Sequence, residues 1–160
     1  MRIGQLRDSR FVARSVAKVS FFVVGTPELA AAKGRPNTLQ DLAHLPTTAL
    51  KDGNTGRIWP WYFAGNQQLT PAMPALVTDD PEVECEAVLA GIGYGQLPSF
   101  LAVPLIRAGR LVTVLDDCRP DPWDLYVYRP QRGPVPARIR LVFDHIVDAL
   151  SDPGAFPVIP

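Results

Sequence analysis

The spacing of apolar residues is most regular near the end of the chain. Between Ile139 and Leu150 the apolar side chains recur at i, i+3, i+4, i+7, i+8 and i+11. At 3.6 residues per turn these positions form one continuous face of an α-helix. The pattern predicts a closing amphipathic helix. The residues of the face are Ile139, Val142, Phe143, Ile146, Val147 and Leu150.

Shorter apolar runs predict strands. Residues 19–24 (VSFFVV) are β-branched and aromatic, which is typical of a buried strand. Residues 92–97, 111–115 and 125–128 predict three further strands. Because strand-like and helix-like segments alternate along the chain, the sequence predicts the α/β class with a largely parallel sheet.

Two short helices are predicted in the first half by their capping residues. Thr26 can cap a helix, and Pro27 suits the first helical position because it has no amide hydrogen to satisfy. Gly34 ends this helix after about two turns. Thr38 begins a second helix, which extends to about residue 43.

The strongest helix start is TDDPE at residues 78–82, which combines capping side chains, a proline and an acidic first turn. Gly91 closes this helix. A following helix is expected over residues 99–107, where Pro104 should shorten or kink it. The apolar face of the helix that begins near residue 80 is expected to consist of Val83, Ala87, Val88 and Ala90.

An aromatic cluster, IWPWYF at residues 58–63, lies between turn signals at residues 52–53 and 64–66. The favoured interpretation is the packed core of a β-hairpin. The alternative is that one ring lines a ligand pocket.

The glycines of GIGYG at residues 91–95 close a helix and enter a strand. A dinucleotide site needs the reverse order, because its amide groups meet the pyrophosphate at the start of a helix. The sequence therefore argues against a nucleotide. The glycines indicate a close approach to the backbone, either by another element or by a small ligand, and both readings stay open.

The polar residues give no sign of catalysis. His44 and His145 have no neighbour at metal-ligand spacing, and no serine or cysteine motif indicates a nucleophile. The acidic pairs at residues 79–80 and 116–117 are interpreted as caps and turn formers. We expect no catalytic residue, no metal ion and no cofactor, and hence no enzyme.

The charge of the chain further narrows the class of protein that the sequence indicates. The 16 basic residues balance the 16 acidic ones, so the basic excess of a free-standing nucleic-acid binder is absent. A sparse basic series is interpreted as a solvated face. Its members are Arg2, Arg7, Arg10, Arg14 and Lys18.

The apolar fraction of 47% suffices for a core, and the 17 prolines imply many turns. Cys85 and Cys118 lack a CxxC partner and are expected to be free thiols, with a disulfide as the alternative. No signal peptide or membrane-spanning apolar stretch is evident, so the protein is expected to be soluble and cytoplasmic.

Five segments, in their order along the chain, resemble the effector-binding domain of LysR-type transcription regulators. The likeness covers about residues 2–150, and the W-x-F element within GRIWPWYF is similar to the CrgA-like branch of the family. The segments are MRIGQLRDSRFVAR, VVGTPELAAAKGRPNTLQDLAHLP, GRIWPWYF, DDPEVECEAVLAGIGYGQLPSFLAVPLIRAGRLVTVL and DLYVYRPQRGPVPARIRLVFDHIVDAL.

The resemblance implies a periplasmic-binding-protein-like fold, with two α/β subdomains joined by crossing strands and the first one truncated. Residues 1–24 would be a remnant of subdomain I, 25–117 subdomain II, 118–150 the return strand and closing helix of subdomain I, and 151–160 a flexible tail. The helix-turn-helix and the start of the effector domain would be missing. An open sheet edge and apolar surface would result.

The resemblance further implies a small organic effector, such as a carboxylate, in the cleft between the subdomains. The helix after Thr26 would offer free amide groups to the carboxylate, and Tyr94 would stack on the effector or donate a hydrogen bond. The ligand-binding residues carried over are Ile3, Gly4, Thr26, Pro27, Gly93, Tyr94, Gly95 and Pro98.

The expected partners are further copies of the chain or full-length regulator subunits. DNA would be reached only through the missing helix-turn-helix. The alternative function is a truncated interaction module, which would oligomerise with full-length regulators without sensing a ligand.

Overall fold

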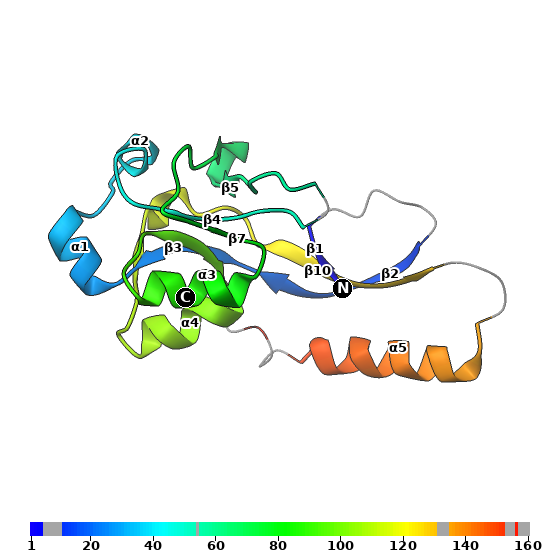
Figure 1. Cartoon of the computed structure of the whole chain (residues 1–160). Coiled ribbons are helices and arrows are strands. Elements are labelled where there is room, and N and C mark those ends of the chain that lie inside the picture. Colours follow the sequence, from blue (N-terminus) through cyan, green and yellow to red (C-terminus); the bar gives the residue numbers. More distant parts are fainter. Residues whose placement is uncertain (5–10, 54, 131–134, 153–155, 157–160) are drawn as a thin grey trace. The chain divides into compact units, whose positions relative to one another are not determined.

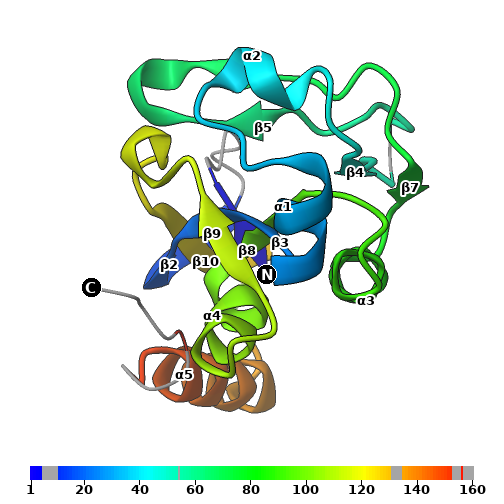
Figure 2. The same ribbon diagram turned by 90° about the vertical axis from the view of Figure 1, so that its left-hand side faces the viewer.

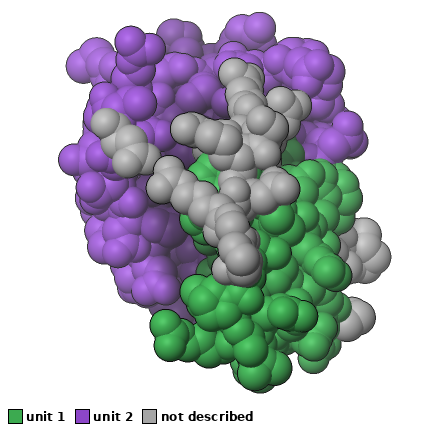
Figure 3. All heavy atoms as spheres, turned by 90° about the vertical axis from the view of Figure 1, so that its right-hand side faces the viewer, with its two compact units in different colours: residues 1–20, 122–160 green, residues 21–121 purple. Residues whose placement is uncertain are grey.

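The computed structural model describes residues 1–4, 11–53, 55–130, 135–152 and 156. Figure 1 shows the whole chain. The chain divides into two compact units, which Figure 3 shows in different colours. Unit 1 consists of Met1–Ser20 and Pro122–Pro160, and unit 2 of Phe21–Asp121. The divisions therefore fall a few residues from the predicted subdomain boundaries at 24/25 and 117/118.

The described residues of unit 1 form three strands and one helix. The strand order is β1-β10-β2, and both pairings are antiparallel. The helix α5 contacts β2 and β10. The elements are β1 (Arg2–Ile3), β2 (Phe11–Val19), β10 (Trp123–Pro130) and α5 (Ala137–Leu150).

Unit 2 has the strand β3 (Phe21–Gly25) between β8 (Gly95–Pro98) and β9 (Val112–Val114). Figure 2 shows the helix α4 (Ser99–Arg107) beside these strands. Both neighbours run antiparallel to β3. Only β4 (Thr48–Leu50) and β7 (Leu76–Thr78) form a parallel ladder among the described strand pairs. The predicted largely parallel sheet is therefore wrong. Strand direction depends on how the long connections return, and local apolar patterns carry no information on that.

The helix starts of unit 2 are confirmed. Thr26 and Asp80 cap α1 and α3, and Thr38 forms a capping box with Asp41 at α2. Pro104 does not shorten α4, which continues to Arg107. The helices are α1 (Pro27–Lys33), α2 (Leu39–Leu42), α3 (Pro81–Leu89) and α4 (Ser99–Arg107), with 3₁₀ turns η1 (Ala64–Asn66) and η2 (Asp116–Cys118).

The buried face of α3 differs from the prediction. Val83 is 49% exposed, whereas Glu84 is 1% exposed and lies among Cys85, Ala87 and Val88 on the inner side. The apolar and acidic residues of this helix do not separate cleanly into two faces. Its sequence alone therefore does not fix which side chain turns inward.

The aromatic cluster forms the predicted hairpin. β5 (Trp61–Tyr62) pairs antiparallel with β6 (Gln68–Leu69). Trp61 and Phe63 are each 3% exposed, whereas Trp59 is 39% exposed. The two buried rings join a core cluster whose other members are Val23, Leu29, Leu42, Tyr94 and Val114.

The helix α5 covers the predicted range, but its apolar face is only partly packed. Phe143 is the buried residue of this helix, while Ile139, Val142 and Ile146 remain exposed. Most of the expected flexible tail (153–155 and 157–160), and Arg7 and Arg10 of the basic series, lie outside the described residues.

Candidate functional site

The first predicted site element is the start of α1. Thr26 caps the helix by accepting a hydrogen bond from the Leu29 amide at 3.1 Å, and its carbonyl accepts one from Ala30 at 3.0 Å. Pro27 has no amide hydrogen. The cap and the proline therefore account for two of the positions in the first turn. Binding of a carboxylate at this helix start stays a prediction.

The glycines at residues 93 and 95 allow other parts of the protein to approach. A side-chain carbon at Gly93 would lie 2.8 Å from the backbone of Pro46 and Thr47. At Gly95 it would lie 2.5 Å from Val88 and 2.8 Å from the Thr48 hydroxyl. Packing within unit 2 therefore accounts for the close approach at both glycines. Contact of these glycines with a ligand stays a prediction.

Tyr94 is a core residue in this conformation. Its side chain is fully buried, and its hydroxyl donates a hydrogen bond to the Gly34 carbonyl at 2.7 Å. A side-chain carbon at Gly25 would lie 2.7 Å from the ring, so this glycine makes room for it. Burial raises the pKa of the Tyr94 phenol. A hydrogen bond from Tyr94 to an effector would require breaking the bond to Gly34.

The remaining predicted site residues are Pro98 in unit 2 and Ile3 and Gly4 in unit 1. Pro98 pairs with Phe21, whereas Gly95 pairs with Val24. Since a strand rises about 3.3 Å per residue, Pro98 is roughly 10 Å along the ladder from that end. Ile3 and Gly4 belong to unit 1. There Gly4 adopts φ +96° and its amide donates to the Asp124 carbonyl at 3.0 Å.

A small cavity in unit 2 is lined by residues outside the predicted ligand-binding set. Its volume is about 10 Å³, near what one water molecule requires. Its walls combine aromatic rings with an amide, a carboxylate and a guanidinium. Among the lining residues are Phe21, Phe63, Gln96, Asp116 and Arg119. Phe63 belongs to the aromatic cluster, so that one cluster supplies both core rings and a pocket wall.

Gln96 links two parts of this cavity wall. Its carbonyl oxygen accepts a hydrogen bond from the Tyr62 amide at 3.0 Å, and its amide nitrogen donates to the Tyr62 carbonyl at 2.7 Å. The side-chain amide of Gln96 thus forms the pair of hydrogen bonds to Tyr62 of β5 that the backbone of a neighbouring strand would form. Gln96 and Tyr62 are 34 residues apart, and no sequence motif predicts this contact.

Further residues that line the cavity are an ion pair, Asp116 and Arg119, and a residue with a positive φ angle, Leu115. Arg119 pairs with Asp116, and its guanidinium lies 4.3 Å from the centre of the Phe22 ring. Asp116 also accepts a hydrogen bond from the Thr113 hydroxyl at 2.7 Å. Leu115, which precedes them, has φ +58°, a conformation that a branched side chain adopts rarely.

A buried carboxyl group lies elsewhere in unit 2. Glu84 of α3 accepts a hydrogen bond from the Thr48 hydroxyl at 2.8 Å, and its second oxygen has no partner among the described residues. Burial raises the pKa of Glu84 to about 7, although the bond from Thr48 acts in the opposite direction. The protonated form of Glu84 is therefore populated near neutral pH.

Other chemistry is sparse in the described part of the chain. It contains no group of three or more His, Cys, Asp or Glu side chains arranged to hold a metal ion. Cys85 and Cys118 are free thiols. No described helix is both long and apolar enough to cross a membrane.

Comparison with known proteins assigns the family. The model of the LysR substrate binding domain matches residues 1–151, and the chain belongs to this family. The transcriptional regulator PtxR of Pseudomonas aeruginosa is 30% identical over 157 residues, which is 94% of this chain and 48% of PtxR. The regulator CrgA of Neisseria meningitidis is 26% identical over 95% of this chain and 51% of its own length.

Solved regulators share the fold. The regulatory domain of AphB from Vibrio vulnificus superposes with a TM-score of 0.74 at 24% identity, covering 92% of this chain and 72% of that domain. The structure of CrgA from Neisseria meningitidis gives 0.72 at 26% identity, covering 93% and 51%. The predicted periplasmic-binding-protein-like α/β class is confirmed. The chain spans about half the length of the curated relatives it matches.

Proposed function

We propose that this chain is the effector-sensing portion of a LysR-type transcription regulator and binds a small organic molecule that modulates transcription. The family match over residues 1–151 carries the proposal. A ligand that favours one conformation of the domain shifts the population toward it, and an oligomeric regulator transmits that shift to DNA. DNA binding would come from a helix-turn-helix of the whole regulator, and further subunits would be its protein partners.

We infer that the effector contacts unit 2 at the cavity around Gln96. It combines an aromatic ring, Phe63, with the Asp116–Arg119 pair, and small-molecule sites are apolar pockets with a few placed polar groups. At about 10 Å³ the cavity must widen to admit an organic acid. Arg119 would supply the cation for a carboxylate if its bond to Asp116 were exchanged. An effector position between the subdomains stays a prediction, as do all of the predicted contacts, at Ile3, Gly4, Thr26, Pro27, Gly93, Tyr94, Gly95 and Pro98.

A ligand screen monitored by amide NMR tests this proposal. The 160-residue chain is mixed with small aromatic and aliphatic acids, and compounds that raise the unfolding temperature are titrated into the ¹⁵N-labelled protein. We expect shifts that concentrate at Tyr62, Phe63 and Gln96, and loss of binding in Arg119→Gln.

The matched control is Arg107→Gln, which removes the same charge from the last turn of α4, away from the cavity lining. Binding that survives Arg119→Gln as well as it survives Arg107→Gln would contradict the assignment. The alternative of a pure interaction module predicts that no such acid shifts these amides, while full-length regulator subunits do.

A further inference from the structure

The carboxyl group of Glu84 lies in the contact between the helix α3 and the strands beside it. Glu84 is 1% exposed, and its Oε1 accepts the hydrogen bond from the Thr48 hydroxyl of β4 at 2.8 Å. A side-chain carbon at Gly95 of β8 would lie 3.8 Å from the same oxygen. The second oxygen, Oε2, is buried and has no hydrogen-bond partner among the described residues. One bond from a hydroxyl is therefore all that the packed structure provides for this carboxyl.

The elements packed against Glu84 provide no charge that compensates a carboxylate. The strands β3, β4, β7 and β8, which α3 contacts, contain no titratable residue. The charged residues of α4, of α3 and of the strand ends are all exposed. They are Lys51, Asp79, Arg107 and Arg110 around the helix, and Asp80, Glu82 and Glu86 on α3 and its cap.

The surroundings of Glu84 therefore suit its protonated form. A neutral carboxyl can hold its proton on Oε2 and still accept the Thr48 bond on Oε1. A carboxylate at the same place would lack water and a cation, which makes it strongly unfavourable. Water reaches the carboxyl only if α3 separates from β4 and β8, so loss of the proton is coupled to this separation.

The coupling has a definite direction with pH. Burial raises the pKa of Glu84 from 4.5 to about 7 while α3 is packed, and the pKa returns toward 4.5 when the carboxyl meets water. The packed state binds the proton more tightly, so separation of α3 increases with pH between 4.5 and about 7 and levels off above this range.

We propose that Glu84 is a proton-controlled latch, which keeps α3 packed on β4 and β8 when it is protonated and lets α3 separate from them when it is deprotonated. Unit 2 would then respond to pH through a part of the fold that no effector has to occupy. None of the residues that line the cavity around Gln96 belongs to α3. The latch therefore holds or fails independently of the proposed effector binding.

The thiol of Cys85 reports the separation of α3. Cys85 follows Glu84 on the buried side of the helix and is 5% exposed. The 160-residue chain and its Glu84→Gln variant are treated with dithiodipyridine, and mass spectrometry of the peptide that contains Cys85 gives the labelling rate. The ratio of wild-type to Glu84→Gln rates, taken at each pH, cancels the pH dependence of the thiol reaction. We expect this ratio to rise at least about tenfold between about pH 5.5 and pH 8.5.

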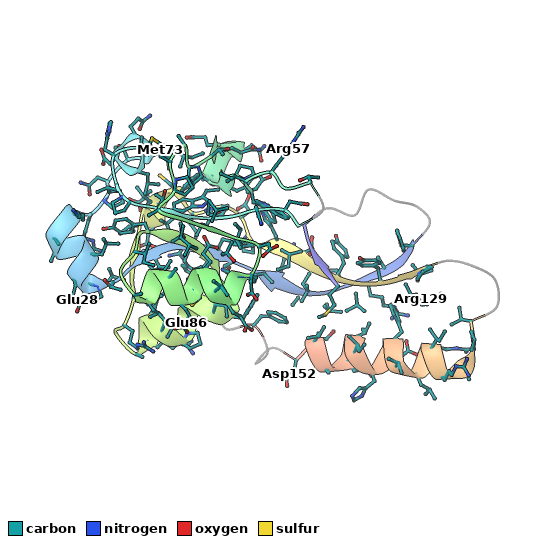
Figure 4. All side chains as sticks on the ribbon, in the orientation of Figure 1. Glu28, Arg57, Met73, Glu86, Arg129 and Asp152 are labelled. Atoms are coloured by element: carbon teal, nitrogen blue, oxygen red, sulfur yellow. The ribbon has the colours of Figure 1, made fainter. Side chains whose placement is uncertain are left out.

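Glu86→Gln is the matched control. Glu86, labelled in Figure 4, lies on the same helix and is exposed. The charges of Glu86 and Glu84 both raise the pKa of the Cys85 thiol, so the two variants change its reactivity in the same direction. Labelling of Glu86→Gln should nevertheless keep the pH dependence of the wild type.

Thr48→Val is a second variant, which tests the latch from the strand side. It replaces the one hydroxyl that bonds to Glu84 by a methyl group of similar size. The bond from Thr48 lowers the pKa of Glu84, so its loss should move the pH at which labelling levels off upward. Circular dichroism verifies that all three variants are folded.

Three results would overturn the proposal. The first is a ratio of wild-type to Glu84→Gln rates that stays constant with pH, and the second is an equal effect of Glu86→Gln. The third is a labelling rate that increases with urea as steeply as global unfolding does. Cys85 would then be reached only when the whole unit unfolds, and α3 would not separate by itself.

Discussion

The helix α4 of unit 2 and the helix α5 of unit 1 both carry apolar residues, but these residues are buried to different extents in the two units. In unit 2 the helix α4 contacts β3 and β8, and its Ala102 and Val103 are fully buried. In unit 1 the helix α5 is longer and more regularly patterned, yet Phe143 is its buried residue. The comparison shows that the apolar pattern of a helix predicts which face is apolar. Whether that face is buried depends on the elements packed around the helix, and the pattern itself carries no information on them.

The largest effect is expected where unit 2 is packed most tightly. Gly95→Ala would place a methyl group 2.5 Å from Val88 and 2.8 Å from Thr48. Overpacking of this kind costs about 3 kcal/mol in the free energy of unfolding. Gly53→Ala is the control, because nothing lies within 4 Å of the added carbon there. Urea denaturation measures both, and similar stabilities of the two variants would contradict the tight packing at β8.

The buried carboxyl of unit 2 predicts a dependence of stability on pH. The pKa of Glu84 is raised from 4.5 to about 7, so the folded state binds a proton more tightly than the unfolded state. The resulting stability is fully present below pH 4.5, is lost as the pH rises through 7, and amounts to up to about 3 kcal/mol. Denaturation midpoints at intervals between about pH 4.5 and pH 8 follow this change.

Glu84→Gln is the matched variant, because its amide oxygen can still accept the bond from Thr48. The variant should remove most of this slope and gain stability relative to the wild type as the pH rises. An unchanged slope in Glu84→Gln would show that Glu84 titrates in the folded protein as it does in the unfolded chain.

A pair of identical substitutions compares the two helices directly. Val103→Ala in α4 removes two methyl groups from a fully buried side chain and should lower the free energy of unfolding by about 2 kcal/mol. Val142→Ala in α5 changes a side chain that is 59% exposed and should alter it by less than about 0.5 kcal/mol. Equal losses would mean that the row on α5 is covered in solution.

The smallest effect concerns the cap of α1. Thr26→Ala removes the oxygen that accepts the Leu29 amide and should cost about 1 kcal/mol, whereas Thr26→Ser keeps the acceptor and should cost less. Thermal unfolding distinguishes the variants. If both substitutions cost the same, the lost methyl group of Thr26, rather than the cap, would account for the effect.

The parts of the fold that the sequence predicted are those decided by neighbouring residues. Thr26, Thr38 and Asp80 cap their helices because a side-chain oxygen needs only the amides two or three residues ahead. The hairpin over residues 61–69 follows from its turn signals. Strand direction and the burial of α3 side chains depend on distant segments. The strand direction and the inward position of Val83 were predicted wrongly, and the burial of Glu84 was not predicted.

The candidate site was less predictable than the fold. Gln96 contacts Tyr62 across 34 residues, and a single glutamine in a strand gives no local signal of that contact. The glycines at residues 93 and 95 indicated a close approach correctly, but only the positions of Pro46, Thr48 and Val88 show what approaches. Tyr94 was expected at a ligand, and its bond to Gly34 depends on where α1 ends.

The central claim is that residues 21–121 form a well-packed unit, while α5 in unit 1 keeps an uncovered apolar row. Amide hydrogen exchange of the 160-residue chain tests it most directly. We predict that amides in β3 and β8 exchange only through global unfolding and that those of α5 exchange at least about a hundredfold faster. Equal protection of α5 and β3 would contradict the account.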